Sequence, residues 1–337
     1  MTPEQALLRV IHYKDRAHES GFNTKAFVRA LDIVRETDPA DLKAMAVAET
    51  HTENDGIGKA TAQVITEAVL DQEPHYLAKV EAESRVSITP EGKVYRDALK
   101  GDCHLHYTWS DGGAPIQAMA ATAMAIGHEY MVQTDHSARL TIAHGLNEER
   151  LAEQLDQIAA VNADIAASGH DFRILAGMEV DILEDGSLDL GDDMLERLDV
   201  VVASVHSKLR MERQQMTERM LMAVASPHVD ILGHCTGRMI GKRPPSEFDA
   251  DYVFAACAQF NTAVEINCRP ERLDPPRELL DVAIEYGCWF SIDSDAHATG
   301  QLEWQPFGCD RAADREVPID RIINTLGAED LLAWTAT

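Results

Sequence analysis

The chain has 337 residues, 45% of them hydrophobic and 6% aromatic, which suits one large domain plus a small one. No apolar run reaches the roughly 18 residues of a membrane span, so a membrane-spanning protein is excluded. The N-terminal segment is amphipathic with mixed charge, unlike a secretory signal, and we therefore expect a cytoplasmic protein.

Charge and cysteine content narrow the classes further. The formal net charge is -27, and most of it lies beyond residue 97, where 18 Lys and Arg face 40 Asp and Glu. Such an acidic surface repels nucleic acid at long range and weighs against tight DNA binding. The six cysteines form no CxxC pair, which favours buried reduced thiols over disulfides or a cysteine-based zinc site.

Residues 1–82 are predicted to form a small domain of short helices. Apolar positions recur at helical spacing in Glu4–His18 and Lys25–Arg35, a third helix opens at Pro39, and a fourth starts at about Lys59.

The turn before that fourth helix is a candidate DNA contact. Gly56 and Gly58 fit a tight turn with outward-facing amides, as in a helix–hairpin–helix element, so Gly56, Gly58 and Lys59 are candidate DNA-binding residues. A plain turn between packed helices explains the same pattern, because a lone GxG motif is weak. Glu53 and Asp55 beside the turn would repel a phosphate.

Residues 83–100 are predicted to be a linker with a short hairpin around Pro90-Glu91-Gly92, and residues 101–337 to be the main domain. In that domain, β-rich runs alternate with helical patterns, among them Asn147–Ser168, Gln214–Ala225 and Pro275–Tyr286. The predicted strands are Asp102–His106, Tyr130–Thr134, Phe172–Val180, Val200–His206, Val229–His234, Ala263–Asn267 and Trp289–Asp293. Seven strands in β–α alternation predict an α/β protein with a (β/α)7 barrel related to the TIM barrel.

Each predicted strand carries a polar side chain capable of binding metal at its C-terminal end, where barrels build active sites. These residues are His104, His106, Asp135, His136, Glu179, Asp181, His206, His234, Asn267, Asp293, Asp295 and His297. One such histidine is usually structural, but six at the same end of successive strands are costly to bury without an ion to coordinate. The imidazole and carboxylate donors suit Zn²⁺, Mn²⁺ or Fe²⁺.

The motifs HLHYTWSDG, TDHS, GMEVDI, SVHS, GHCTGR, EIN and SIDSDAH, in this order, closely resemble the PHP (polymerase and histidinol phosphatase) domain over about residues 100–334. Within that family, the segments EINCRPERLD and PIDRIINTLGAEDLLAW are similar to the C-terminal PHP domain of bacterial family X DNA polymerases. Residues 1–82 resemble the N-terminal helix–hairpin–helix domain of those polymerases, except that Asn54-Asp55 replaces an apolar-Pro pair. The palm and fingers between the two are missing, so the resemblance excludes polymerase activity.

The resemblance implies a distorted barrel and a hydrolase that cleaves phosphate esters with three divalent ions per chain. One ion would bind His104, His106, Glu179 and Asp295, the second would bind Asp111, His136 and His297, and the third would bind His206 and His234, with Glu179 as a bridge. The expected nucleophile is a metal-bound hydroxide held by the same cluster.

Basic residues after the strands are candidates for holding the phosphate of the substrate: Lys208, Arg238, Arg269 and Arg272. We read Asp181 as a residue that orients a ligand. The resemblance favours a DNA-directed phosphodiesterase, either a 3′-5′ exonuclease or a 3′-end-processing enzyme. A small-molecule phosphomonoesterase resembling histidinol phosphatase, and a non-catalytic binding module, are the alternatives. The natural substrate, the metal used in the cell and the oligomeric state stay open.

Overall fold

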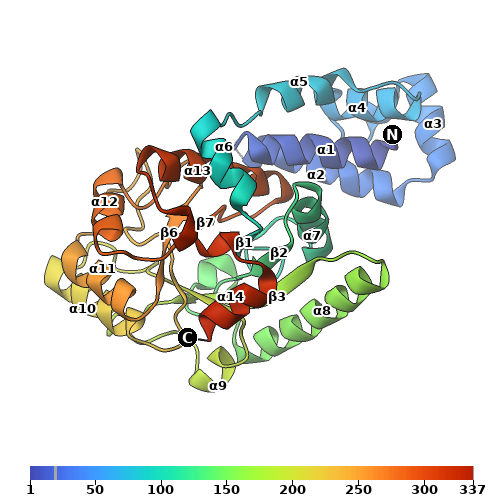
Figure 1. Ribbon diagram of the computed structural model, residues 1–337. Helices are drawn as coiled ribbons and strands as arrows, with labels where there is room; N and C mark the ends of the chain where they lie inside the picture. Colours follow the sequence, from blue (N-terminus) through green and yellow to red (C-terminus); the bar gives the residue numbers. More distant parts are fainter. Residues whose placement is uncertain (19–20, 337) are drawn as a thin grey trace. The chain divides into compact units, whose positions relative to one another are not determined.

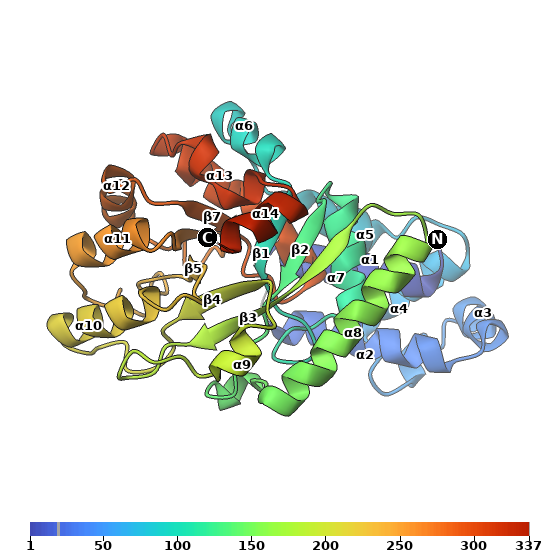
Figure 2. The same cartoon turned by 60° about the horizontal axis from the view of Figure 1, so that its bottom comes forward.

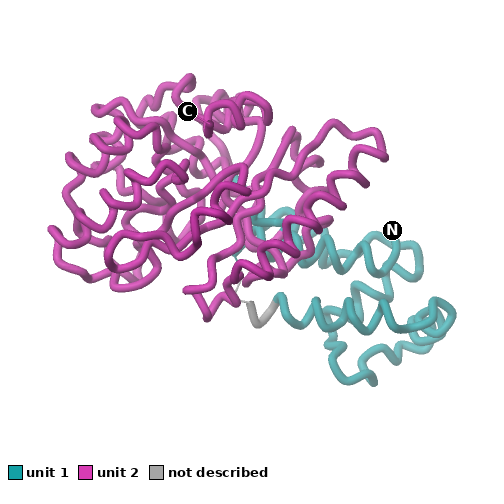
Figure 3. Tube along the Cα trace, turned by 90° about the horizontal axis from the view of Figure 1, so that it is seen from below, with its two compact units in different colours: residues 1–86, 299–301 teal, residues 87–298, 302–337 magenta. Residues whose placement is uncertain are grey.

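The computed structural model describes residues 1–18 and 21–336. The chain divides into two compact units, which Figure 3 shows in different colours. The helical unit comprises residues 1–86 with 299–301, and the barrel unit comprises residues 87–298 and 302–337. The division after Val86 falls inside the segment that the sequence assigns to a linker.

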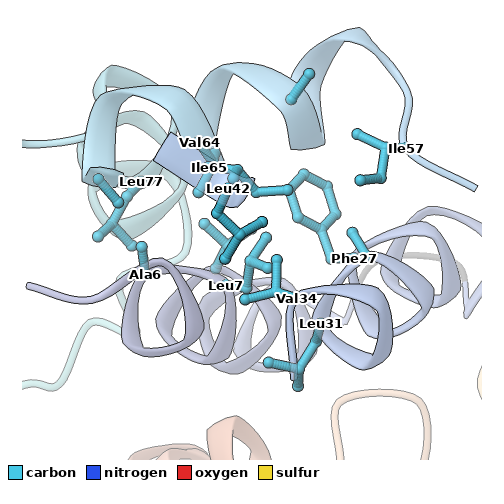
Figure 4. Packing of buried hydrophobic residues seen from close by; sticks show 14 of the residues in the cluster. Ala6, Leu7, Phe27, Leu31, Val34, Leu42, Ile57, Val64, Ile65 and Leu77 are labelled. Atoms are coloured by element: carbon cyan, nitrogen blue, oxygen red, sulfur yellow. The ribbon is translucent and has the colours of Figure 1, made fainter. Parts of the chain in front are cut away.

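The helical unit contains the helices expected from the apolar periodicity. The four predicted helices are α1 (Pro3–Arg16), α2 (Gly21–Glu36), α3 (Pro39–Ala48) and α4 (Lys59–Val69), and the unit also contains the short 3-10 helix η1 (His51–Glu53) and α5 (His75–Glu83). A capping box begins α1, because the Thr2 hydroxyl accepts from the Gln5 amide while the Gln5 side chain accepts from the Thr2 amide. Buried apolar side chains from these helices, including Leu7, Phe27 and Ile65, form one core (Figure 4).

The segment after Val86 is wrongly predicted as a hairpin. It forms the helix α6 (Pro90–Ala98), which begins with Thr89 as N-cap and Pro90 at its first position. The Thr89 hydroxyl accepts from the Gly92 amide at 2.9 Å and also lies 2.7 Å from a carboxylate oxygen of Asp310 in helix α13 (Gln305–Asp314). A Cβ atom at Gly92 would collide with that carboxylate, so the glycine permits close packing rather than a turn.

The barrel unit is built on seven parallel strands that neighbour one another in chain order and form a nearly closed barrel (Figures 1 and 2). The strands are β1 (Gly101–Leu105), β2 (Tyr130–Gln133), β3 (Arg173–Asp181), β4 (Val200–Ser204), β5 (Ile231–Leu232), β6 (Ala263–Asn267) and β7 (Phe290–Asp293). Every predicted strand is present, and each of their ends lies within two residues of its predicted position. The expectation of a (β/α)7 TIM-like barrel is therefore confirmed.

Helices connect the strands and lie outside the barrel, as Figure 2 shows for α8, α10 and α11. The α-helices of this unit are α7 (Ile116–Ala125), α8 (Glu148–Ala167), α9 (Asp192–Leu195), α10 (Arg213–Val224), α11 (Ala250–Gln259), α12 (Arg277–Glu285), α13 (Gln305–Asp314) and α14 (Ala328–Thr335). The 3-10 helices after α7 are η2 (Thr141–Ala143), η3 (Thr299–Trp304), η4 (Ile319–Arg321) and η5 (Ile323–Thr325). None of the described helices is both long and apolar enough to cross a membrane.

The first strand, β1, and the last strand, β7, are joined by one isolated β-bridge and by hydrogen bonds to side chains. Leu105 pairs with Ala296, and the His106 amide donates to the Ala296 carbonyl at 2.8 Å. Deeper in the barrel, the Asp293 carboxylate accepts from the Cys103 amide at 2.8 Å and from the Asn324 side chain at 2.8 Å. This closure brings the ends of β1 and β7 together. All six cysteines are buried and free, as the sequence predicts.

Candidate metal centre

The polar residues predicted at the strand ends converge at the C-terminal end of the barrel. Glu179, at the end of β3, is buried at the centre of the cluster. Its Oε1 atom is 2.8 Å from His234 Nε2 and 3.2 Å from His206 Nε2. Its Oε2 atom is 2.7 Å from His136 Nδ1 and 3.3 Å from His104 Nε2. One carboxylate therefore contacts histidines from the ends of four strands.

The remaining predicted ligands complete the cluster on the side of β1 and β7. His106 Nε2 lies 3.6 Å from Asp295 Oδ1, and both side chains are buried. Asp111 Oδ1 lies 3.5 Å from His136 Nε2 and 3.4 Å from His297 Nε2. The Asp111 side chain is 37% exposed, so this part of the cluster faces the opening of the barrel.

All nine predicted ligands belong to groups whose donor atoms are close enough to hold an ion together. The four groups are His106, Asp111, His136 and His297; His104, Glu179 and His234; His104, His106 and Asp295; and His136, Glu179 and His206. They differ from the division that the family resemblance implies, because His206 and His234 fall in separate groups, each with Glu179. The division of the ligands among ions stays a prediction.

Divalent ions fit the donor atoms of this cluster. Buried nitrogen atoms of His104, His106, His206 and His234, and both Glu179 oxygen atoms, have no partner in hydrogen-bonding geometry. Leaving so many buried polar atoms unpaired is costly, and coordination to cations would satisfy them together. The set contains imidazole and carboxylate donors without a thiolate, as in the catalytic sites of Zn²⁺, Mn²⁺ and Fe²⁺.

The charge balance also favours cations. Burial alone would raise the pKa of Asp295, but the nearby Arg269 and Arg272 outweigh it and hold that pKa well below its usual range. Burial likewise opposes ionisation of Glu179, yet His206 and His104 help to hold the pKa of this carboxyl well below its ordinary value. Both carboxylates are therefore ionised at neutral pH.

Two further carboxylates hold ligand histidines in place from behind. Asp181 Oδ1 accepts from the His206 amide at 3.0 Å and lies 3.2 Å from His206 Nδ1, which matches the orienting role predicted for it. Glu265 in β6 lies 2.6 Å from His104 Nδ1 and accepts from the His234 amide at 2.5 Å. Glu265 was not among the site residues predicted from the sequence. Its position in the sequence could have indicated it, because Glu265 lies two residues before Asn267 and the two side chains therefore lie on one face of the strand.

The predicted phosphate-binding residues differ in their surroundings. Arg272 Nε is 3.1 Å from Asp295 Oδ2, and its buried Nη1 atom has no hydrogen-bond partner, so this nitrogen could donate to an anion. Arg269 Nη1 lies 3.2 Å from His297 Nδ1. The Arg238 guanidinium instead donates to the carbonyls of Arg272 and Leu273, and Lys208 is exposed. Arg272 and Arg269 thus contact the cluster, whereas Arg238 supports the loop that carries them.

The candidate DNA-binding turn lies in the helical unit, between η1 and α4. Gly56 has a φ of 109°, which favours glycine, and Gly58 is the N-cap of α4, followed by Lys59. Asp55 forms an exposed ion pair of 3.1 Å with Arg29. These contacts are compatible with a plain turn, and DNA binding by this turn stays a prediction.

Comparison with known proteins supports the family resemblance. No protein-family model matches the chain. It is 40% identical over 236 residues to the DNA polymerase/3′-5′ exonuclease PolX of Bacillus subtilis strain 168, a match that covers 70% of this chain and 41% of PolX. The chain thus spans less than half the length of that relative.

Shorter relatives are matched over most of their length. A probable phosphatase of Aliivibrio fischeri strain MJ11 is 26% identical over 239 residues, which is 67% of this chain and 88% of the phosphatase. A solved structure of histidinol phosphate phosphatase from Lactococcus lactis, with zinc, L-histidinol and phosphate, gives a TM-score of 0.46 at 17% identity, over 65% of this chain and 94% of that one. The chain is thus similar to the DNA polymerase/3′-5′ exonuclease PolX and to probable phosphatases, in agreement with the resemblance of its motifs to the PHP (polymerase and histidinol phosphatase) domain of bacterial family X DNA polymerases.

Proposed function

We propose that this chain is a metal-dependent phosphoesterase that cleaves phosphodiester bonds at DNA 3′ ends, as a 3′-5′ exonuclease or an end-processing enzyme. The observation that carries the proposal is the convergence of six histidines and three carboxylates around Glu179. The PolX relative, whose name includes a 3′-5′ exonuclease, supports the choice of DNA. We propose three divalent ions per chain, of Zn²⁺, Mn²⁺ or Fe²⁺, bound by His104, His106, Asp111, His136, Glu179, His206, His234, Asp295 and His297.

Divalent ions bound by such ligands lower the pKa of water and neutralise negative charge on a phosphate ester. The residues of the chain would supply the rest. Glu179 and Asp295 stay ionised, so they favour the binding of cations. Asp181 fixes the ring of His206, and Glu265 fixes the ring of His104. Arg272 Nη1 would donate to a non-bridging phosphate oxygen, because arginine suits phosphate geometry.

A small-molecule phosphomonoesterase is the second candidate. The net charge of -27 disfavours a polyanionic substrate at long range, and the phosphatase relatives are consistent with a smaller one.

The test compares three substrates with the same protein. Full-length chain supplied with Mn²⁺, Zn²⁺ or Fe²⁺ is incubated with a labelled oligonucleotide that has a free 3′ end, with histidinol phosphate, and with a chromogenic phosphomonoester. We expect shortening of the oligonucleotide from its 3′ end. Turnover of only the monoesters would reject the DNA-directed function, and no turnover with any metal would favour a binding module. Metal analysis of the purified protein should find three ions per chain.

A further inference from the structure

The opening of the barrel is strongly divided in charge. The loops after β4, β5 and β6 (residues 205–212, 233–249 and 268–276), together with Arg213 at the start of α10, contain eight Lys and Arg against five Asp and Glu. The loops after β1, β2, β3 and β7 (residues 106–115, 134–147, 182–191 and 294–298) contain one against six. In a chain with a net charge of -27, a local excess of three positive charges at one side of the candidate centre, opposite an excess of five negative charges, needs an explanation.

The three basic loops are tied into one body. The Ser246 hydroxyl donates to the Leu209 carbonyl at 2.8 Å and so joins the loops after β4 and β5. The Ile240 amide donates to the Glu271 carbonyl at 2.6 Å, which joins the loops after β5 and β6. The backbones of these loops are therefore held in fixed relative positions, which lowers the entropy cost of ordering the loops on an anion. We call this surface the basic patch, and its cations are Lys208, Arg210, Arg213, Arg238, Lys242, Arg243, Arg269 and Arg272.

The basic patch is continuous from the candidate metal centre to the outer rim. Arg272 contacts Asp295 at its inner end. Arg243 lies close to Arg272. Burial is the main cause that lowers the pKa of Arg243, and the positive charge of Arg272 lowers this pKa further. Arg243 also lines two grooves, one of about 260 Å³ with Arg210 and one of about 430 Å³ with Lys242. The first of these grooves is also lined by Glu212 and Glu247, so an extended anion would contact Arg210, Arg243 and Lys242 along a path on which positive charge is in excess.

The outermost cations are available for a partner. Lys208, Arg210 and Lys242 are exposed, and none of them forms an ion pair with a described acidic residue, although the chain has 57 acidic residues. A small phosphomonoester would lie within the metal centre, where Arg269 and Arg272 beside Asp295 are the only basic side chains needed to bind its phosphate. Three unpaired cations farther out fit a ligand that carries several phosphates in a row.

We propose that the basic patch binds the sugar-phosphate backbone of a single-stranded nucleic acid whose 3′ end lies at the metal centre. This inference rests on the proposed function. A single strand is favoured because the other side of the opening is acidic, so the second strand of a duplex would meet repulsion there. A positively charged groove that follows one backbone is the usual way in which proteins hold single strands.

The test measures binding to a labelled 12-nucleotide single strand by fluorescence anisotropy at several salt concentrations, with phosphorothioate linkages that slow hydrolysis. Arg210→Glu/Lys242→Glu should raise Kd by about tenfold or more. It should also reduce the slope of log Kd against log salt by about 1.4, or about 0.7 for each lost phosphate contact. The matched control is Arg173→Glu/Arg197→Glu, an equal charge change on residues that begin β3 or precede β4 at the opposite end of the barrel. The control should change Kd by less than about threefold.

Three outcomes would overturn the proposal. One is equal weakening by the two double variants, which would mean that only net charge matters. Another is displacement of the strand by polyglutamate as effectively as by unlabelled oligonucleotide, which would indicate an acidic protein partner instead. The third is no binding of the strand by the unsubstituted chain. A separate assay measures hydrolysis of a small chromogenic phosphodiester by the unsubstituted chain. Hydrolysis in this assay would support the phosphoesterase function even if the basic patch proves not to bind nucleic acid.

Discussion

The helical unit and the barrel unit bury polar side chains in different ways. Among the described residues of the helical unit, only Thr24 and His51 have buried side-chain nitrogen or oxygen atoms without a hydrogen-bond partner. In the barrel unit such atoms occur on several side chains, and those of five histidines (His104, His106, His136, His206 and His234) and of Glu179 converge at one end of the barrel. A folded core can contain one unpaired buried histidine at a tolerable cost, whereas a group of them around a carboxylate indicates a cation site. The helical unit therefore buries side chains that mainly stabilise its fold. The opening of the barrel unit instead contains unpaired polar atoms that lower stability and can bind cations.

The largest effect expected from this comparison is loss of activity in the barrel unit. His206→Ala removes a side chain that contacts Glu179 at 3.2 Å, and we expect phosphoesterase activity to fall by about a thousandfold or more, equivalent to about 4 kcal/mol. The matched control is His228→Ala, which changes a histidine outside the cluster, before β5. Steady-state kinetics on the same substrate measure both variants. Activity that survives in His206→Ala would contradict the proposed centre.

The second prediction concerns the apolar core of the helical unit. Leu7→Ala removes a fully buried side chain and should lower the free energy of unfolding by about 2–5 kcal/mol. Leu8, the next residue on the same helix, is 41% exposed, and Leu8→Ala should change stability by about 0.5 kcal/mol or less. Urea unfolding followed by circular dichroism compares the two variants. The contrast between the units would break down if Leu7→Ala abolished activity under conditions where the protein stays folded.

The third prediction separates a positioning residue from the ligands. Glu265→Gln keeps the size of the side chain but weakens the contact with His104 Nδ1, now 2.6 Å. Metal affinity and activity should fall by about 10–100-fold, less than for a ligand. Glu265→Asp keeps the charge and should recover part of the loss. Metal titration by calorimetry provides a measurement that does not depend on turnover, and unchanged affinity in Glu265→Gln would contradict the role.

The fourth prediction is a pH dependence of stability at the other end of the barrel, whose effect within any one pH unit is small. Burial raises the pKa of Asp230 to about 8, although its carboxylate accepts from the Val201 amide at 2.7 Å. The folded state therefore binds the proton more tightly than the unfolded state, whose pKa is about 4. This contribution to stability is complete below pH 4 and is lost as the pH rises towards 8, by at most about 1.4 kcal/mol per unit.

Asp230→Asn removes this titration and keeps an oxygen that can accept from the Val201 amide. The stability of the variant relative to the parent should therefore increase with pH between about 4 and 8. Urea unfolding at pH 5, 6 and 7 measures the difference. A difference that stays constant over this range would show that Asp230 does not titrate there.

The sequence predicts the barrel and its ligands because both depend on short, regular patterns. Each strand is a buried apolar run with a polar residue at its C-terminal end, so the ends of parallel strands must bring these residues together. Glu265 was not predicted because it lies inside a strand, where nothing in the local pattern shows that its side chain points to His104 from β1. That contact depends on closure of the barrel.

The error at residues 90–92 has a local cause. Pro90-Glu91-Gly92 favours a turn when read alone, but Thr89 before Pro90 is also a helix start. Packing of Gly92 against Asp310 of α13 decides between the two, and this partner is more than 200 residues away in the sequence. The basic patch was similarly predicted only in part, through Lys208, Arg238, Arg269 and Arg272, because its unity depends on hydrogen bonds between loops.

Closure of the barrel between β1 and β7 has a consequence for the order of folding. The Cys103 amide and the Asp293 carboxylate that join these strands are 190 residues apart in the sequence. Contacts at such separation are among the slowest to form, because the chain between them must first be ordered. His104 and Asp295 flank this closure, so the ligand set is incomplete until the last strand docks on the first. During synthesis on the ribosome, the nascent chain cannot assemble the full centre before His297 has left the exit tunnel, and the two ligand groups that contain Asp295 or His297 would be completed last.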